Sequence, residues 1–158
     1  MGMNGMTNIS ASGAPAVSVA RDLFRGEGRA ARLVGSRCEG CGSTYFPRAL
    51  GCRNPACSRP PVQETLLASH GVLYSYTVQT FRPPPLFRMD DWSPYAIGLV
   101  ELADDRIRVL GMLGGCPLDQ LRIGMALEMD TRTLYRDAQG QDVMTYQFVP
   151  RGAQAVAA

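Results

Sequence analysis

Cys38-Glu-Gly-Cys41 and Cys52-Arg-Asn-Pro-Ala-Cys57 are two closely spaced cysteine pairs with ten residues between them. Each pair suits a tight turn, and two facing turns supply four thiolates to one tetrahedral Zn²⁺, which binds sulfur at about 2.3 Å. Glycines on either side of Cys41 favour the first turn, because the turn directs backbone N–H groups toward sulfur and often needs positive φ. We therefore predict one zinc ion bound by Cys38, Cys41, Cys52 and Cys57. Because four thiolates leave no open coordination position, this zinc is expected to be structural.

Other interpretations of the four cysteines stay open at this point. Two structural disulfides, or thiols that are simply buried, are compatible with the same residues. Four thiolates also suit iron, which would make the site an electron-transfer centre. The colour of the protein separates the two metals, since an iron–thiolate protein is red or brown.

The composition is that of an ordinary soluble protein, with 158 residues, a net charge of +2 and 46% hydrophobic residues. This length fits one domain, or a small module followed by a barrel. No stretch approaches the ~20 apolar residues of a membrane helix, and the first residues lack the features of a signal peptide. Cysteines in metal-binding spacing then indicate a reducing compartment. We expect a cytoplasmic protein with no membrane partner.

The two ends of the chain and the segment before the cysteines carry separate expectations. Small uncharged residues fill positions 1–14 and dominate positions 151–158, so both ends are expected to be disordered. Residues 15–32 are predicted to form a short helix, with proline in its first turn and Leu23 and Phe24 on one apolar face. A helix this short needs a surface to pack on, either in its own domain or on another protein.

Residues 62–150 contain short apolar segments separated by turn residues, which is the pattern of a small β-barrel. Strands are expected at 72–78, 95–102, 106–113, 125–130 and 143–149, the second and third forming a hairpin. Five strands without a long helix fit the OB barrel. The alternation predicts a core that includes Val72, Tyr74, Tyr76, Ile97, Leu99, Val109, Leu127 and Phe148.

The loop at 81–92 carries three consecutive prolines, two phenylalanines and the only tryptophan. Aromatic residues, methionine and arginine are enriched in the cores of protein interfaces. Long loops in compact domains are usually either functional or disordered. Phe81, Phe87 and Trp92 are therefore candidates for contact with a partner or a ligand, and packing on the barrel is the equal alternative.

Basic residues are concentrated around the cysteines. All sixteen are arginine, and residues 21–59 hold eight of them with three acids, a net charge of +5. The remainder of the chain has a net charge of −3. Such a module attracts the phosphates of a nucleic acid or of a small phosphorylated cofactor, unless it is only a solvated face.

The sequence lacks the pattern of a catalytic site. His70 is the only histidine, and no nucleophile can be paired with it. Cys116 has no adjacent cation to lower its pKa, so it is expected to be a small buried thiol. A Gly-rich phosphate loop and a dinucleotide fingerprint are also missing. We expect a protein that is not catalytic alone.

Taken together, the segments resemble a known family. Arg37-Cys38-Glu-Gly-Cys41-Gly42 is followed by Phe46-Pro47, the second cysteine pair and Gly71-Val-Leu-Tyr-Ser-Tyr-Thr-Val78, and later by Pro94-Tyr-Ala-Ile-Gly-Leu-Val-Glu-Leu102 and Ile123-Gly-Met-Ala-Leu-Glu128. Over residues 17–150 the chain resembles the acyl-CoA-associated zinc-ribbon and OB-fold family, domain-of-unknown-function family thirty-five. Its second cysteine pair has four intervening residues where the family commonly has two.

The resemblance implies a mainly β protein with a rubredoxin-like zinc ribbon at 33–61 and a five-stranded OB-fold barrel at 62–150. It also implies an accessory subunit of a thiolase-like, aldolase-type or MaoC-like acyl-CoA enzyme, and we expect a thiolase-type partner in a hetero-oligomer. A CoA ester, with a bulky or aromatic acyl group, is then the expected ligand of the complex. Its phosphates are expected at Arg37, Arg48 and Arg53, because guanidinium groups bind phosphate in bidentate fashion. The partner is expected at Phe81, Phe87, Trp92, Leu23 and Phe24.

A single-stranded nucleic-acid-binding OB protein is the competing interpretation. Such a protein presents exposed aromatic residues for base stacking, interleaved with basic residues. Here Tyr74 and Tyr76 are predicted to face the core, and the barrel half is net acidic, which opposes binding of a phosphate backbone. We therefore expect no nucleic-acid partner.

Overall fold

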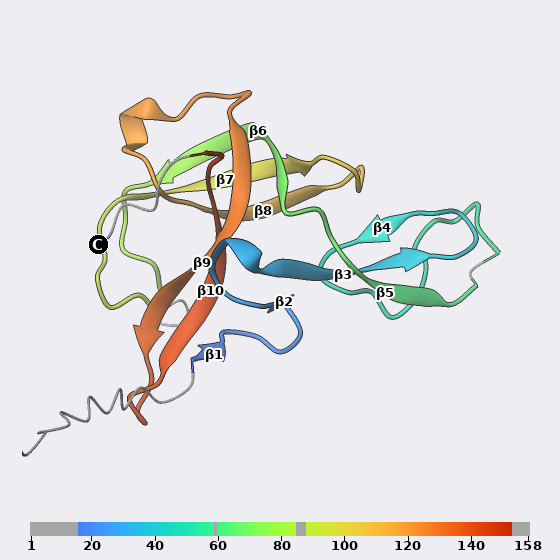
Figure 1. Cartoon of the computed structure of the whole chain (residues 1–158), viewed down its shortest axis with the longest axis horizontal. Coiled ribbons are helices and arrows are strands. Elements are labelled where there is room, and N and C mark those ends of the chain that lie inside the picture. Colours follow the sequence, from blue (N-terminus) through green and yellow to red (C-terminus); the bar gives the residue numbers. More distant parts are fainter. Residues whose placement is uncertain (1–15, 59, 85–87, 153–158) are drawn as a thin grey trace, which may run out of the picture.

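The structure is a computed structural model that describes residues 16–58, 60–84 and 88–152. It contains a barrel of five long strands and a smaller sheet that carries the four cysteines (Figure 1). The disorder expected at 1–14 falls outside the described residues, as do positions 153–158 of the C-terminal segment. No helix formed by the described residues is long and apolar enough to cross a membrane.

Five strands close the barrel. In chain order they are β6 (His70–Gln79), β7 (Tyr95–Leu102), β8 (Arg108–Leu113), β9 (Ala126–Arg136) and β10 (Asp142–Pro150). They pair in the order β6–β7–β8–β10–β9, and β9 pairs again with β6. Only the short β8–β10 contact among these is parallel. All five predicted strands and the predicted hairpin are confirmed, and the connection from β8 to β9 holds a 3₁₀ turn, η2 (Leu118–Gln120).

One apolar cluster fills the barrel. Its buried members come from all five barrel strands, from the start of β3 and from the connecting segments, and they include Leu33, Leu73, Val100, Val109, Leu127, Met129 and Phe148. Phe148 is fully buried, and its ring packs edge-on against Tyr146 with the ring centroids 6.2 Å apart. The burial of Val109, Leu127 and Phe148 confirms these three predicted core positions.

The core face of β7 is opposite to the predicted one. Ile97 and Leu99 are only half-buried, because the inward positions are Ala96, Gly98, Val100 and Leu102. The strand is apolar on both faces, so its alternation does not identify the inner one. Close packing requires the small residue at 98, since a Cβ there would lie 2.7 Å from Cδ2 of Leu113 and 2.8 Å from Cδ1 of Leu73.

In β6 the predicted core assignment is also wrong at two positions. Leu73 is fully buried, whereas Val72 and Tyr74 are 46% and 48% exposed. A β-bulge between Leu73 and Ser75 shifts the register with β7, so the alternation seen in the sequence is not kept along the strand. Beyond the bulge, Tyr76 packs against the core cluster, as predicted.

Residues 16–32 form no α-helix, which overturns the predicted N-terminal helix. The segment instead contains β1 (Val17–Ser18), β2 (Phe24–Arg25) and a 3₁₀ turn, η1 (Gly28–Ala30). β1 pairs in parallel with β10, and β2 pairs with β3. Positive φ angles of 54° at Asp22 and 84° at Gly26 are incompatible with a continuous right-handed helix. Pairing with the distant β10 and with the neighbouring β3 therefore decides the structure of this segment.

The smaller sheet is built on β3 (Arg32–Cys38). β5 (Val62–Leu66) pairs antiparallel along most of β3, while β2 pairs with its beginning and β4 (Thr44–Tyr45) with its end. We call this sheet with its cysteine-bearing turns the ribbon. β3 connects the ribbon to the barrel, because Leu33 belongs to the barrel cluster and Cys38 to the cysteine quartet.

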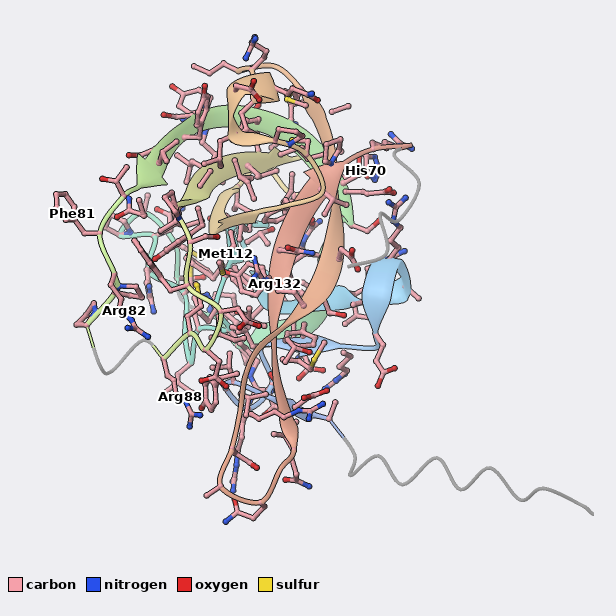
Figure 2. All side chains as sticks on the ribbon, turned by 90° about the vertical axis from the view of Figure 1, so that its left-hand side faces the viewer. His70, Phe81, Arg82, Arg88, Met112 and Arg132 are labelled. Carbon is pink, nitrogen blue, oxygen red and sulfur yellow. The ribbon has the colours of Figure 1, made fainter. Side chains whose placement is uncertain are left out.

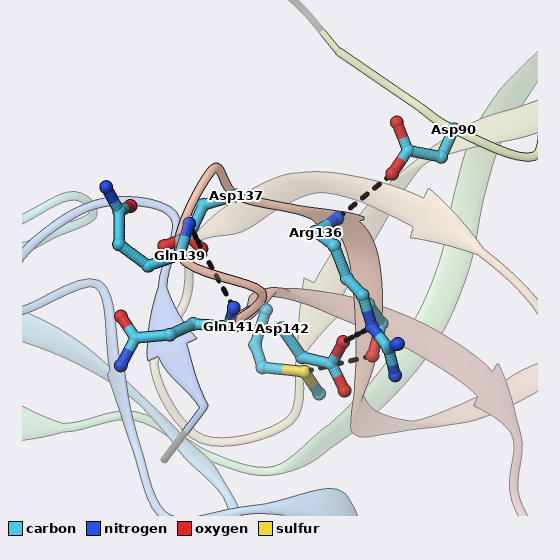
Figure 3. Close-up of polar contacts among 8 residues, drawn as sticks. Asp90, Arg136, Asp137, Gln139, Gln141 and Asp142 are labelled. Atoms are coloured by element: carbon cyan, nitrogen blue, oxygen red, sulfur yellow. Dashed lines mark hydrogen bonds and ion pairs between the residues drawn. The ribbon is translucent and has the colours of Figure 1, made fainter. Parts of the chain in front are cut away.

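The β9–β10 hairpin extends away from the barrel (Figure 1). Its turn is stabilised by the carboxylate of Asp137, which accepts hydrogen bonds from the backbone N–H groups of Gln139 and Gln141 at 2.9 and 2.8 Å (Figure 3). The backbone N–H of Arg136 donates to the Asp90 carboxylate at 3.0 Å, which ties the long loop after β6 to this hairpin.

Candidate metal centre and the adjoining cleft

The four predicted metal ligands lie together. The sulfur atoms of Cys38, Cys41, Cys52 and Cys57 are all within 4.8 Å of one another. The separations are 3.7 Å between Cys38 and Cys57 and 3.6 Å between Cys41 and Cys52. A tetrahedron with Zn–S bonds of 2.3 Å has sulfur atoms about 3.8 Å apart. The four side chains are therefore grouped closely enough to hold a single tetrahedral ion.

Two tight turns place the cysteines. In the first, the N–H of Cys38 donates to the Ser43 carbonyl at 2.9 Å, and the N–H of Gly42 donates to the Cys38 carbonyl at 3.0 Å. Gly42 has a φ of 72°, the left-handed conformation that the sequence suggested. In the second, the N–H of Cys57 donates to the Asn54 carbonyl at 3.2 Å. This turn accommodates the four residues between the second pair of cysteines.

Hydroxyl groups around the cysteines favour the thiolate form. The Ser43 hydroxyl lies 3.1 Å from the sulfur of Cys41, and mainly for that reason the pKa of Cys41 is lowered to about 6. The Tyr45 hydroxyl lies 3.3 Å from the sulfur of Cys52 and is the main cause of a lowered pKa there. Thiolates are the form that binds metal. None of the five cysteines, all within the described residues, forms a disulfide.

The residues between the cysteine pairs divide between the two parts of the molecule. Tyr45 also accepts a hydrogen bond from the backbone N–H of Arg53 at 2.9 Å, so it links the second turn to β4. Phe46 packs instead on the barrel, edge-on against Tyr146 with the ring centroids 5.7 Å apart. The ribbon is thereby attached to the barrel through an aromatic contact made by the residue that follows β4.

A cleft of about 810 Å³ lies between the ribbon and the turn that connects β7 to β8. Figure 1 shows that turn pointing toward the ribbon beside β4. The ribbon side is formed by Arg37, by both cysteine turns and by β4, and the barrel side by residues 104–107. The arginines in it are Arg37, Arg53 and Arg106, and the acids are Asp104 and Asp105.

The three arginines predicted to contact CoA have different surroundings. Arg37 lies 3.3 Å from the carboxylate of Asp105, which is only 8% exposed and also accepts the backbone N–H of Ala68 at 2.6 Å. Arg53 lines the cleft with its guanidinium 5.9 Å from the centre of the Tyr45 ring. Arg48 does not line the cleft and pairs with Glu64 at 2.7 Å.

The barrel side of the cleft was not predicted from the sequence. From the sequence, Asp104 and Asp105 are expected only in the turn of the predicted hairpin, and Arg106 only at the start of its second strand. The sole local signal is charge density in a tight turn, which is common in solvated turns. Arg106 adopts a φ of 52°, a conformation that a glycine would take more readily.

The residues predicted for a partner interface differ in exposure. Phe81 is 86% exposed and projects away from the barrel (Figure 2). Trp92 is half-buried and packs against the small cluster of Met89, Met112 and Leu134. Leu23 and Phe24 are half-buried, and Phe24 packs against the barrel cluster. Phe87 lies outside the described residues.

His70 and Cys116 form no catalytic pair. His70 begins β6, where its carbonyl accepts the N–H of Ala103 at 3.1 Å. Cys116 is half-buried against the barrel cluster, and burial, followed by the nearby charge of Asp119, raises the pKa of its thiol. A raised pKa disfavours the reactive thiolate.

Two family profiles match the chain. One is described as "ChsH2, rubredoxin-like zinc ribbon domain" and matches residues 27–62. The other is described as "ChsH2, C-terminal OB-fold domain" and matches residues 64–132. They agree with the predicted fold, a zinc ribbon followed by an OB-fold barrel.

Several relatives are similar over both parts. A DUF35 domain-containing scaffold protein of Methanocaldococcus jannaschii is 33% identical over 118 residues, covering 73% of this chain and 78% of the relative. A protein of the same description from Methanothermobacter thermautotrophicus is 32% identical over 118 residues, with coverage of 73% and 83%. The benzoylsuccinyl-CoA thiolase subunit BbsA of Thauera aromatica is 27% identical over 122 residues, with coverage of 77% and 78%.

A solved structure is similar as well. A chain of the Ltp2-ChsH2(DUF35) aldolase superposes with a TM-score of 0.58 at 31% sequence identity. The match covers 75% of this chain and 84% of that chain.

Proposed function

The chain belongs to the DUF35 family of zinc-ribbon and OB-fold proteins, and from this membership we propose that it is an accessory subunit of an acyl-CoA enzyme. In this proposal it has no catalytic groups of its own and associates with a thiolase-type subunit to support acyl-CoA binding and turnover. The observation that carries the proposal is its similarity to a thiolase subunit over 77% of the chain.

The metal in this proposal is a structural zinc held by Cys38, Cys41, Cys52 and Cys57. The sulfur separations of 3.6 and 3.7 Å and the hydroxyl groups that favour thiolates support it. Bound zinc would supply folding free energy to the ribbon and no open position for a substrate.

The proposed ligand of the complex is a CoA ester with a bulky or aromatic acyl group, as in a degradation pathway. The thiolase to which the relative belongs carries an aromatic acyl-CoA in its name, which supports this class. Within the chain, Arg37 and Arg53 are the proposed phosphate contacts, because both line the cleft. Arg48 is a weaker candidate, since it does not line the cleft and is paired with Glu64 at 2.7 Å.

The proposed docking surface is centred on the loop at 81–92. Phe81 supports it most directly. Its aromatic side chain is 86% exposed, and burying it against a partner removes this apolar surface from water. Trp92, which packs in one cluster with Met89 of the same loop, would support this surface, and Phe24 stays a separate proposed contact. Aromatic anchors in such interfaces typically contribute about 2 kcal/mol or more on truncation.

Co-elution on a sizing column tests the proposal, with the chain and a thiolase-type subunit from the same organism and with condensation and thiolysis assayed in each fraction. We expect one peak containing both chains and acyl-CoA turnover that depends on both. Phe81→Ala should weaken co-elution while zinc remains bound, and Arg151→Ala, far from the loop in sequence and exposed, serves as the control. Turnover of acyl-CoA by the isolated chain would contradict the accessory role.

An aldolase-type enzyme is a second candidate partner. The specific observation in its favour is the 31% identity to the chain of an aldolase complex, against 27% for the thiolase subunit. Running the same column with an aldolase-type subunit decides between them, because a stable complex should form with only one.

The nucleic-acid interpretation has one observation in its favour. Tyr74 is exposed, and the Arg108 guanidinium lies 3.5 Å from the centre of its ring. Tight binding of single-stranded DNA at physiological salt, with no binding to either enzyme, would favour this interpretation.

A further inference from the structure

We propose that the cleft between the ribbon and the β7–β8 turn binds a phosphate monoester, and that Arg106 is its principal ligand from the barrel. The identity of the natural ligand rests on the proposed function, which supplies the 3′-phosphate of CoA. The binding chemistry rests only on the residues of the cleft.

Two guanidinium groups in the cleft are available. In the described part of the chain, neither Arg53 nor Arg106 forms an ion pair, and both side chains are exposed. They approach from opposite walls, Arg53 from the second cysteine turn and Arg106 from the barrel. Guanidinium groups prefer bidentate contact with phosphate oxygens. A phosphate group between the two walls would complete the coordination of both.

The hydroxyl side chains of the cleft leave the arginines as its ligands for phosphate. Thr44 lines the cleft, but its hydroxyl oxygen is shielded from solvent and so lies out of reach of a group bound there. The Ser43 hydroxyl beside it is already engaged with Cys41.

The two acids of the cleft do not cancel its attraction for a phosphate group. Asp105 is buried and satisfied by Arg37 and by the N–H of Ala68, so its charge is compensated within the protein. Asp104 is exposed and remains the one uncompensated carboxylate of the cleft. The three arginines and two acids leave a formal charge of +1. A monoester, with a charge of about −1.5 to −2 at neutral pH, is attracted more strongly than a diester.

Isothermal titration of the full-length zinc-loaded chain with CoA and with 3′-dephospho-CoA is the primary test. Both ligands carry the same diphosphate, pantetheine and adenine, and only CoA carries the monoester. We expect CoA to bind about tenfold more tightly than dephospho-CoA, the order of effect of losing charge-assisted hydrogen bonds. Inorganic phosphate should compete with CoA. Equal affinity for the two ligands would overturn the proposal.

Three variants locate the site. Arg106→Gln should weaken CoA binding about tenfold and leave dephospho-CoA binding unchanged, because it removes one guanidinium from the cleft. Arg21→Gln removes the same charge from an exposed site outside the cleft and should change the affinity less than about twofold, through screened long-range charge alone. Asp104→Asn should tighten CoA binding. An equal loss in the two arginine variants would show that only net charge matters. Weaker binding in Asp104→Asn would show that this carboxylate does not repel the bound ligand. Either result would overturn the site.

The CoA-binding test and the co-elution test of the proposed function have independent outcomes. If the chain co-elutes with an acyl-CoA enzyme but Arg106→Gln leaves CoA affinity unchanged, the cleft proposal is wrong and the accessory role stands. If the chain binds CoA through Arg106 but joins no such enzyme, the cleft proposal stands and the accessory role is wrong. Zinc content and the thermal unfolding midpoint of each variant exclude loss of folding as the cause.

Discussion

The barrel and the ribbon bury very different amounts of apolar surface. Thirteen buried residues form the barrel cluster, and each of the five barrel strands contributes to it. Between positions 38 and 62 of the described chain, the buried apolar residues are Cys38, Ala49 and Cys52, two of which are predicted metal ligands. A β-strand pair of two or five residues is not stable without further support. We therefore expect the barrel to fold on apolar burial, and the cysteine-bearing turns of the ribbon to depend on a bound metal.

Loss of one metal ligand should have the largest effect and should separate the two parts. Structural zinc sites supply about 10–16 kcal/mol in small zinc-binding peptides, and Cys41→Ser removes one of four thiolates. We expect loss of bound zinc, poor expression and loss of hydrogen-exchange protection in β3 and β5. Metal analysis and amide exchange measure this. Cys116→Ser is the matched control and should keep stoichiometric zinc, and a zinc-free wild-type protein would contradict the comparison.

Truncation of a side chain in the barrel core should have the opposite result, a less stable barrel with the zinc still bound. Phe148 is fully buried in the cluster, so Phe148→Ala should lower the free energy of unfolding by about 3–5 kcal/mol. Zinc should remain bound in native conditions, because the four cysteines lie outside the cluster to which Phe148 belongs. Urea unfolding followed by circular dichroism measures the change. Leu110→Ala, at a position 60% exposed, should change stability by less than about 0.5 kcal/mol and serves as the control.

The contact between the two parts should have an intermediate effect. Asp105 accepts the N–H of Ala68 at 2.6 Å and lies 3.3 Å from Arg37 while almost buried. Asp105→Asn removes the charge and weakens both contacts, so we expect a loss of about 1–3 kcal/mol. Amide chemical shifts should change in both the ribbon and the barrel. The exposed neighbour variant Asp104→Asn should leave stability unchanged, and an equal loss there would argue against a specific role of Asp105.

A surface ion pair in the ribbon should have the smallest effect. Arg48 and Glu64 are 2.7 Å apart, with side chains 44% and 31% exposed. Such pairs contribute about 0–1 kcal/mol, so Arg48→Gln should hardly change the unfolding midpoint. It should also leave CoA affinity unchanged, in contrast to Arg53→Gln. If Arg48→Gln weakened CoA binding as much as Arg53→Gln, Arg48 would also be a contact of the ligand.

The sequence predicted those features that depend on local spacing. Cysteine spacing identified the quartet, and turn residues between apolar runs identified five strands. The inner faces of β6 and β7 were not predictable from alternation, because a bulge follows Leu73 and because Gly98 must face inward for Leu113 to fit. Side-chain size in these strands was therefore a poor guide to burial.

The sequence did not predict features that depend on which segments pair or lie side by side in the fold. Val19, Leu23 and Phe24 have helical spacing, yet β1 and β2 pair with β10 and β3. Arg53 and Arg106 are remote in sequence. They line the same cleft only because the ribbon lies beside the β7–β8 turn. No local pattern in either segment indicates that encounter.

The order of the strands along the chain has a consequence for biosynthesis. All pairing within the ribbon involves residues 24–66, so this part is complete in the growing chain before any barrel strand has been made. Barrel closure requires β10, which ends at Pro150, because only β10 joins β8 to β9. Chains are synthesised at about 5–20 residues per second, and domains nearer the N-terminus generally fold first. The nascent protein can thus acquire its metal several seconds before its barrel exists.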